Sequence, residues 1–314
     1  MKNIIILIVG LLLIGLSVYL LIVRSANIDV SQPEVPNPDT ASTTTETTIE
    51  LEEVTDSETS SEEEPRGETT VLGRSVQGKE ILAYHYGTGS KELLLIGGIH
   101  GGYSWNTALL AYQLQDWLKA TPEVIPENFT ITIIPNLNPD GLMAITKKDG
   151  QFEKADVSGT EAQKVAARFN ANQVDLNRNF DCLWKETGRW RDQNVKAGTM
   201  PFSEPETLAL KNYVERNKPY AVVAWYSASG GVYASACENG ILPLTKSLTG
   251  AYAAGANYPA YDEYDYYEIT GDMMNWFAKI GVPAISVLLT SHEETELLKN
   301  QAGLKFILSL EGRQ

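Results

Sequence analysis

The stretch Val174-Asp175-Leu176-Asn177-Arg178-Asn179-Phe180 is the centre of five short motifs that decide the fold. Two lie upstream, Ile96-Gly97-Gly98-Ile99-His100-Gly101-Gly102-Tyr103-Ser104 and Pro135-Asn136-Leu137-Asn138-Pro139-Asp140-Gly141. Two lie downstream, Pro201-Phe202-Ser203-Glu204-Pro205-Glu206-Thr207 and Tyr267-Glu268-Ile269-Thr270-Gly271-Asp272. Asn-Pro-Asp-Gly alone predicts only a turn. The order of the five motifs is therefore more informative than any one of them.

Short apolar runs alternate with segments of helical periodicity in this part of the chain. Runs such as Glu92–Ile96 are typical of central strands that are buried on both faces. We expect strands at residues 80–86, 92–96, 129–134, 221–225 and 284–289. We expect helices at residues 104–119, 204–217, 242–254, 272–280 and 293–310, the second of them capped by Ser203. This alternation predicts an α/β fold.

The first 24 residues differ in kind from the rest. Ile4 to Val23 is an uncharged apolar run between Lys2 and Arg24, long enough to span a hydrocarbon core of roughly 30 Å. The alternative is a cleavable signal peptide, but no clear small-x-small cleavage site follows the run. Residues 1–24 are therefore interpreted as a transmembrane signal anchor, with the remainder of the chain outside the cytoplasm.

Residues 25–70 are rich in Ser, Thr, Glu and Pro and contain 13 acids and one base. Such a segment buries too little apolar surface to offset its ordering entropy, so we expect a disordered acidic tether. Residues 71–314 retain 27 acids and 22 bases, so the net charge of −15 resides mostly in the tether. No basic patch suggests nucleic acid as a partner. Cys182 and Cys237 can form a disulfide outside the cytoplasm or remain as two thiols, and the sequence leaves this open.

The five motifs resemble those of the zinc carboxypeptidase family (carboxypeptidase A/T-like exopeptidases, or funnelins), in a degenerate bacterial-type form. The resemblance extends from about Leu72 to Leu310. It implies one domain over residues 71–314, a three-layer α/β/α sandwich around a mixed, largely parallel central sheet. In the family this fold carries a zinc ion held by three protein ligands, with one open position.

The resemblance places the first zinc ligand at His100, but the other ligand positions differ. The bacterial pattern His-Gly-Gly-Tyr-Glu reads His100-Gly101-Gly102-Tyr103-Ser104, so the second position is Ser104, or Tyr103 in the alternative register. The third, the His of a Trp-His-Ser-like motif, is Tyr226. A neutral hydroxyl is a poor zinc ligand beside a carboxylate or imidazole. No cofactor is therefore expected.

The position of the family's general base is Leu288, which cannot accept a proton. Of the other two histidines, His85 is interpreted as a strand side chain. His292 is the one alternative near the site, and it would still leave a metal one ligand short. The lone His100 is interpreted as a buried, hydrogen-bonded histidine.

Substrate-binding positions of the family are retained as Arg168, Asn177, Arg178 and Tyr267. In the family the Asn-Arg pair holds a C-terminal carboxylate, the upstream arginine polarises the scissile carbonyl and the tyrosine closes over the bound residue. A structural alternative makes Asn177 a turn former and Arg178 the partner of Asp175 or Asp140.

Three functions follow from this pattern. The favoured one is an inactive binder of peptide or protein C-termini, with cell-wall peptides among the candidates, attached to the membrane through residues 4–23. The second is a working metallocarboxypeptidase with an irregular metal site. The third is a structural or interaction module with a vestigial pocket.

Overall fold

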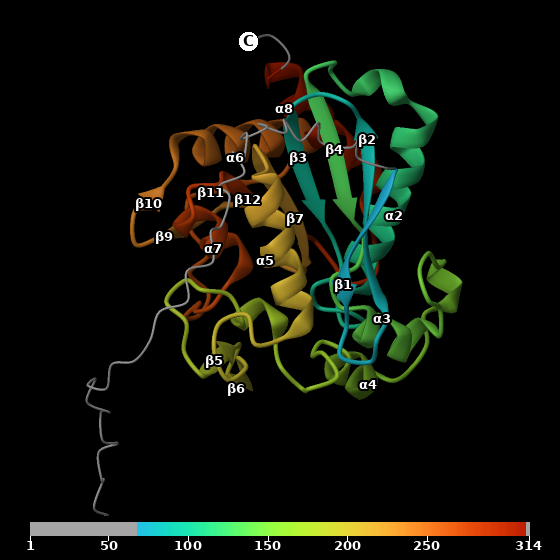
Figure 1. Ribbon diagram of the computed structural model, residues 1–314, viewed down its shortest axis with the longest axis vertical. Coiled ribbons are helices and arrows are strands. Elements are labelled where there is room, and N and C mark those ends of the chain that lie inside the picture. The colour runs from blue at the N-terminus through green and yellow to red at the C-terminus, as the bar shows by residue number, and fades with distance from the viewer. Residues whose placement is uncertain (1–67, 312–314) are drawn as a thin grey trace, which may run out of the picture. The chain divides into compact units, whose positions relative to one another are not determined.

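The computed structural model describes residues 68–311 (Figure 1). The expected anchor and most of the expected tether lie outside this range. Strand β1 begins at Thr69, so the folded part starts within the last two residues assigned to the tether. Between residues 68 and 311, every helix is too short or too polar to cross a bilayer.

An eight-stranded mixed sheet forms the centre of the domain, in the order β1-β2-β4-β3-β7-β12-β8-β11. Strands β4, β3, β7 and β12 pair in parallel, whereas β1 with β2, β2 with β4, and β8 with β12 pair antiparallel. The parallel strands are buried on both faces, which explains their continuous apolar sequences. The strands are β1 Thr69–Arg74, β2 Glu80–Gly87, β3 Lys91–Ile96, β4 Phe129–Ile134, β7 Ala221–Ser227, β8 Gly231–Ala234, β11 Ala260–Tyr261 and β12 Ala284–Leu289.

Helices cover both faces of this sheet (Figure 1). Successive side chains of a strand point to opposite faces, so Leu93 and Leu95 join one apolar cluster with α2, α6 and α8. Leu94 and Ile96 join a second cluster with α5 and α7. The expected three-layer α/β/α fold is confirmed. The helices are α2 Trp105–Ala120, α3 Pro139–Thr146, α4 Glu161–Ala166, α5 Pro205–Asn217, α6 Pro243–Ala256, α7 Met273–Lys279 and α8 Leu297–Glu311.

Two local expectations were wrong. Asn138-Pro139-Asp140-Gly141 starts helix α3 instead of forming a separate turn: Asn138 Oδ1 accepts the Gly141 N–H at 3.0 Å, and Pro139 occupies the first helical turn. Helix α5 is capped at Glu204, not at Ser203. A tertiary contact accounts for this start of the helix, because the Glu204 N–H donates to Asn179 Oδ1 at 3.1 Å.

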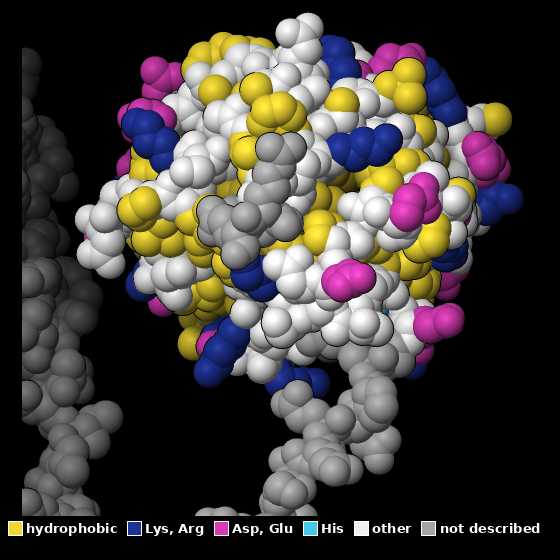
Figure 2. All heavy atoms as spheres, turned by 90° about the horizontal axis from the view of Figure 1, so that it is seen from above, with side chains coloured by type: hydrophobic (Ala, Val, Ile, Leu, Met, Phe, Trp, Pro, Cys, Tyr) yellow, Lys and Arg dark blue, Asp and Glu magenta, His cyan; other side chains and the backbone are white. Residues whose placement is uncertain are grey.

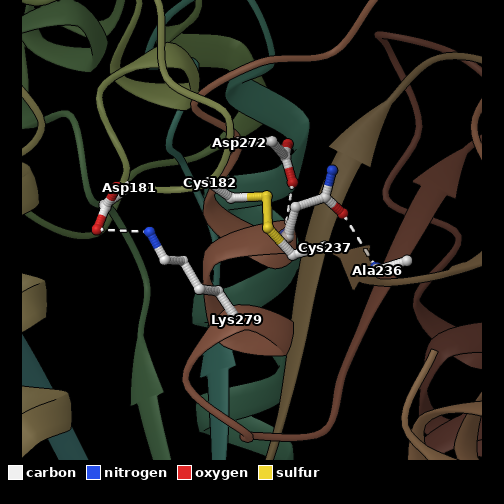
Figure 3. Close-up of a disulfide and its surroundings, with 7 residues drawn as sticks. Asp181, Cys182, Ala236, Cys237, Asp272 and Lys279 are labelled. Atoms are coloured by element: carbon white, nitrogen blue, oxygen red, sulfur yellow. Dashed lines mark hydrogen bonds and ion pairs between the residues drawn. A yellow bond between two sulfur atoms is a disulfide. The ribbon is translucent and has the colours of Figure 1, made fainter. Parts of the chain in front are cut away.

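Cys182 and Cys237 form a disulfide, with their Cα atoms 6.3 Å apart (Figure 3). It connects the loop that follows Phe180 to strand β9 (Ala236–Cys237), which pairs with β10 (Gly240–Ile241) in a small separate sheet. Beside it, Lys279 forms an ion pair with Asp181 at 2.9 Å. The stretch after the central motif is thus covalently attached to β9, which lies against α7.

Lys and Arg side chains are interspersed with Asp and Glu on the face shown in Figure 2. This face presents no surface of a single sign of charge.

Candidate functional site

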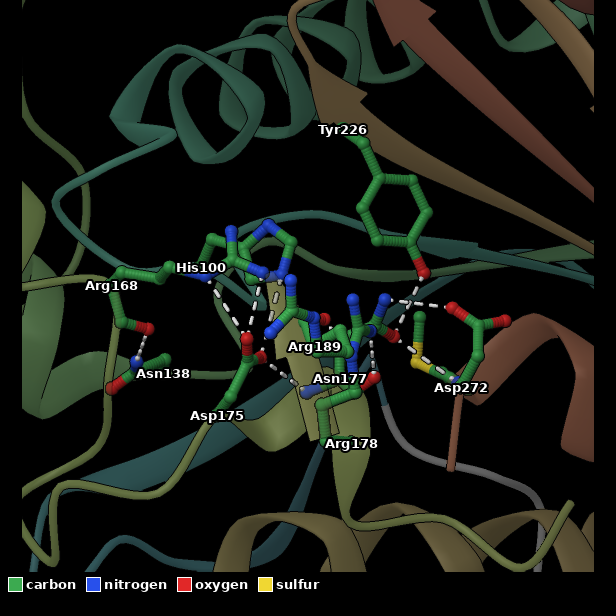
Figure 4. A network of polar contacts seen from close by, with 10 residues as sticks. His100, Asn138, Arg168, Asp175, Asn177, Arg178, Arg189, Tyr226 and Asp272 are labelled. Carbon is green, nitrogen blue, oxygen red and sulfur yellow. Dashed lines mark hydrogen bonds and ion pairs between the residues drawn. The ribbon is translucent and has the colours of Figure 1, made fainter. Parts of the chain in front are cut away.

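The carboxyl ends of β3, β7 and β12 meet at one edge of the sheet, where open α/β sheets bind their ligands. His100 lies in the loop after β3, and Tyr226 and Leu288 are register partners near the ends of β7 and β12. The short 3₁₀ helix Leu176–Arg178 brings the central motif to the same edge. Figure 4 shows the resulting polar network around His100, Asp175 and Arg178.

The residues at the family's metal position do not fit zinc. His100 is 5 % exposed, as expected for a buried histidine. The expected hydrogen bond was wrong, because neither ring nitrogen has a hydrogen-bond partner. Burial and the positive charge of Arg168 lower the pKa of His100 well below its ordinary value, which keeps the ring neutral. Among residues 68–311, no three His, Cys, Asp or Glu side chains are grouped so that they could hold a metal ion.

The hydroxyl groups at the second ligand position do not complete a site. Ser104 Oγ is buried without a partner, and the Tyr103 hydroxyl accepts a hydrogen bond from Arg191 at 2.9 Å. Within residues 68–311, the carboxylate at ion-pair distance from His100 is that of Asp175, whose Oδ1 lies 3.7 Å from His100 Nε2. Asp175 is already ion-paired with Arg168.

Tyr226 stands where the family places its third ligand. Its ring centroid is 5.7 Å from that of His100, and its hydroxyl donates to Asn177 Oδ1 at 3.4 Å. Burial raises the pKa of Tyr226 well above its ordinary value, so it remains a neutral phenol. Its strand partner Leu288 is 8 % exposed and presents only apolar atoms. Neither side chain can take a proton from a bound water molecule.

Arg168 and Asp175 form a buried ion pair. Both Nε and Nη2 of Arg168 donate to Asp175 Oδ2, at 3.0 and 2.8 Å. Burial alone would raise the pKa of Asp175, but the positive charges of Arg168 and Arg178 lower it to about 2. The alternative made Arg178 the partner of Asp175 or Asp140; the direct ion pair of Asp175 is instead with Arg168, although the charges of Arg178 and Asp175 also attract each other. The indole ring of Trp190 lies 4.4 Å from the Arg168 guanidinium and fixes its other side.

Asn177 and Arg178 reach the same place but are held by internal partners. Asn177 Nδ2 donates to Asp272 Oδ2 at 2.7 Å, while Asn177 Oδ1 accepts the Met273 N–H at 3.1 Å. Arg178 is 1 % exposed; its Nε donates to the Arg189 carbonyl at 2.9 Å and its Nη1 to the Asn177 carbonyl at 2.5 Å. Burial raises the pKa of Asp272 above its ordinary value.

A hairpin that the sequence did not indicate covers this network. Strands β5 (Thr187–Trp190) and β6 (Gln193–Lys196) pair outside the main sheet. The backbone of Gly188 lies so close to Arg178 that a Cβ there would be 2.7 Å from Arg178 Cδ. Tyr267, the fourth expected binding residue, is 5.9 Å from the Arg178 guanidinium. The four expected substrate residues thus lie around one centre, beneath this hairpin.

The two remaining histidines serve other contacts. His85 in β2 lies within 2.9 Å of the Thr70 and Thr132 hydroxyls, as expected for a strand side chain. His292 Nδ1 is 3.0 Å from Ser227 Oγ, and its ring centroid is 4.5 Å from that of Tyr103. Its pKa is lowered by burial and by Arg191. His292 therefore belongs to the rim of the site and does not complete the ligand set of His100.

Comparison with known proteins shows the family of this chain and agrees with its fold. The profile of the zinc carboxypeptidase family matches residues 57–304, so the chain belongs to that family. Murein peptide amidase A of Vibrio campbellii is 29 % identical over 231 residues, which cover 70 % of this chain and 78 % of the relative. Rat carboxypeptidase Z is 28 % identical over 170 residues, which cover 47 % of this chain and 24 % of that protein.

Solved structures agree in fold. The murein-tripeptide amidase from Escherichia coli O157 has a TM-score of 0.55 at 22 % identity, over 79 % of this chain and 93 % of that chain. Bovine thrombin-activatable fibrinolysis inhibitor, in complex with tick carboxypeptidase inhibitor, has a TM-score of 0.60 at 17 % identity, over 78 % and 90 % of the two chains.

Proposed function

We propose that this protein is a non-catalytic member of the zinc carboxypeptidase family that binds the C-termini of peptides outside the cytoplasm, attached to the membrane through residues 4–23. The observation that carries the proposal is the contrast within one site. The metal and base positions are His100, Ser104, Tyr226 and Leu288, which do not fit zinc or accept a proton. The carboxylate-binding positions converge around Arg178.

The chemistry of the site favours an anion without supporting hydrolysis. Arg168 and Arg178 contribute two positive charges; Asp175 is ion-paired with Arg168, and the second carboxylate, Asp272, has a pKa that burial raises. Asn177 and Arg178 are the donors that would hold a terminal carboxylate, as a charge-assisted pair. The ligand must replace an existing partner of Arg178, such as Tyr267 or the Arg189 carbonyl. This replacement predicts modest affinity, on the order of micromolar to millimolar.

Peptides of the cell wall are the first ligands to test, because two of the relatives are named murein peptide amidases. The same geometry accepts other peptides that end in a free carboxylate. The fixed requirement is the terminal carboxylate, and the side chains nearest to Asn177 that could set a side-chain preference are Asp272 and Met273 at the start of α7.

The test compares one peptide in two forms, with a free C-terminus and with a C-terminal amide, by titration calorimetry on the full chain. The acid should bind and the amide should not. Arg178→Lys keeps the charge but loses the fork, so it should weaken the acid preference, and His100→Ala should leave it unchanged. Equal binding of the acid and the amide would exclude the proposal and leave a vestigial pocket, consistent with the burial of Arg178.

A further inference from the structure

A run of tyrosines and acids leads from the proposed pocket to the surface. It reads Tyr261-Asp262-Glu263-Tyr264-Asp265-Tyr266-Tyr267-Glu268. It begins in β11, the edge strand that pairs in parallel with β8 and places Tyr261 opposite Tyr233 (Figure 1). Only Tyr267 of this run has a part in the carboxylate site described above.

The rings form a connected series, here called the tyrosine ladder (Tyr233, Tyr261, Tyr264, Tyr266 and Tyr267). Tyr267 lies 5.9 Å from Arg178 and 5.5 Å from Tyr264. Tyr264 lies 5.0 Å from Tyr266 and 5.4 Å from Tyr233, and Tyr233 stacks on Tyr261 at 4.7 Å. These separations fall in the range of favourable aromatic pairs.

The backbone is adapted to this arrangement at Gly231. Its φ is +126°, and a Cβ there would lie 2.8 Å from the ring of Tyr261. A side chain at this position would displace the ring from β8.

The outermost rings of the ladder, Tyr261 and Tyr266, are exposed, and two acidic residues beside them in the sequence have no ion-pair partner in the described part of the chain. Tyr261 is 42 % exposed and Tyr266 is 62 % exposed. Asp262 pairs with Lys246 at 2.9 Å and Glu268 with Lys185 at 2.5 Å. Glu263 and Asp265 are exposed and form no ion pair within residues 68–311.

We propose that the exposed end of the tyrosine ladder binds a cationic side chain, a lysine or a chemically similar amine, of the peptide whose carboxylate lies at Arg178. An ammonium group is attracted to the face of a tyrosine ring and, over a longer range, to Glu263 and Asp265. This inference rests on the proposed function for the position of the peptide. The ladder itself supplies the aromatic surface and the charge complementarity.

The spacing limits where the cation sits in the peptide. Three steps of 5.9, 5.5 and 5.0 Å join Arg178 to Tyr266. An extended chain advances about 3.3 Å per residue, so the path covers no more than about five residues. The amine should therefore belong to a residue two to five positions before the C-terminus.

The experiment uses four peptides of one sequence on the full chain: lysine or norleucine at the third position from the end, each with a free acid or an amide. The lysine peptide should bind about three- to tenfold more tightly than the norleucine peptide at low salt. This preference should shrink at 0.5 M salt (about 4 Å screening length). Tyr266→Leu and the pair Glu263→Gln with Asp265→Asn should remove it.

One variant separates the contribution of the Tyr266 ring from that of its hydroxyl, and a second is a control outside the ladder. Tyr266→Phe keeps the aromatic face and should keep the lysine preference. Leu298→Ala alters an exposed apolar residue in α8, outside the ladder, and should have no effect.

The four peptides also separate the two proposals. A lysine preference without an acid preference supports the ladder and excludes the carboxylate pocket. An acid preference with no lysine preference, in these peptides and in matched sets with the lysine at the second, fourth or fifth position from the end, overturns the ladder, as does the absence of binding to all of the peptides. Weaker binding in Tyr266→Leu that is insensitive to lysine and to salt would assign the rings to a neutral ligand, such as a sugar, and would also overturn the cationic assignment.

Discussion

Replacing Arg168 with methionine should destabilise the domain strongly, because it leaves the Asp175 carboxylate buried without its partner. Asp175 is 0 % exposed and accepts two hydrogen bonds from Arg168, at 3.0 and 2.8 Å. Removing one member of a buried pair costs about 3–5 kcal/mol, mostly from the uncompensated charge. Methionine fills much of the same volume, so the loss of packing against Trp190 should be a smaller part of the cost.

The second replacement, Asp175→Asn, tests this reasoning. The double variant Arg168→Met/Asp175→Asn removes both charges and should recover at least about half of the loss, giving a coupling energy of about 2 kcal/mol or more. The assay is urea unfolding of the wild type, both single variants and the double variant at pH 7. Additive effects in the double variant would refute the assignment of the ion pair.

The pH dependence gives an independent check on the same pair. The folded-state pKa of Asp175 is about 2, below the ordinary value near 3.9. A depressed acid pKa stabilises the fold at pH values above the unfolded pKa, by on the order of 2–3 kcal/mol, and this contribution is lost as the pH falls from about 4 towards 2. Wild-type stability should fall in that window, and Asp175→Asn should lack this component.

Two further perturbations test the site and its support. Ser104→Glu with Tyr226→His should create zinc binding, and adding Leu288→Glu should create peptidase activity. A folded triple variant that binds no zinc on metal titration would show that the loop at His100 has also diverged, and Tyr103→Glu is then the alternative register. Replacing both cysteines with serine should cost about 4 kcal/mol, because the bond closes a separation of 55 residues, and an unchanged unfolding midpoint would show that the bond adds nothing.

The central strands are predictable from the sequence because strands that are buried on both faces have continuous apolar sequences. Strands β4 and β12 coincide with their expected ranges, Phe129–Ile134 and Ala284–Leu289, and β3 and β7 differ from theirs by one or two residues at one end. Their apolar runs have no other stable location than the middle of a covered sheet. The positions at the sheet edge then follow from the motifs.

Contacts at the periphery were less predictable, because tertiary partners decide them. The hairpin of β5 and β6 is short and polar, and its place is set by packing on Arg178 and Arg168. Asp175 could have paired with either arginine, since both lie within seven residues of it in the sequence. Asn138 suits a turn or a helix cap equally well, and its bond to Gly141 selects the cap.

The loss of the metal site is best tested by measuring the zinc content of the purified full chain. We expect well under one zinc per chain after incubation with excess metal and buffer exchange, because His100 is the one retained residue at the family's ligand positions and no three His, Cys, Asp or Glu side chains within residues 68–311 are grouped to hold a metal. Chelators should then leave the melting temperature unchanged, since no binding free energy is lost. A stoichiometry near one zinc per chain, with a melting temperature that falls on chelation, would contradict the account and favour a working metallocarboxypeptidase.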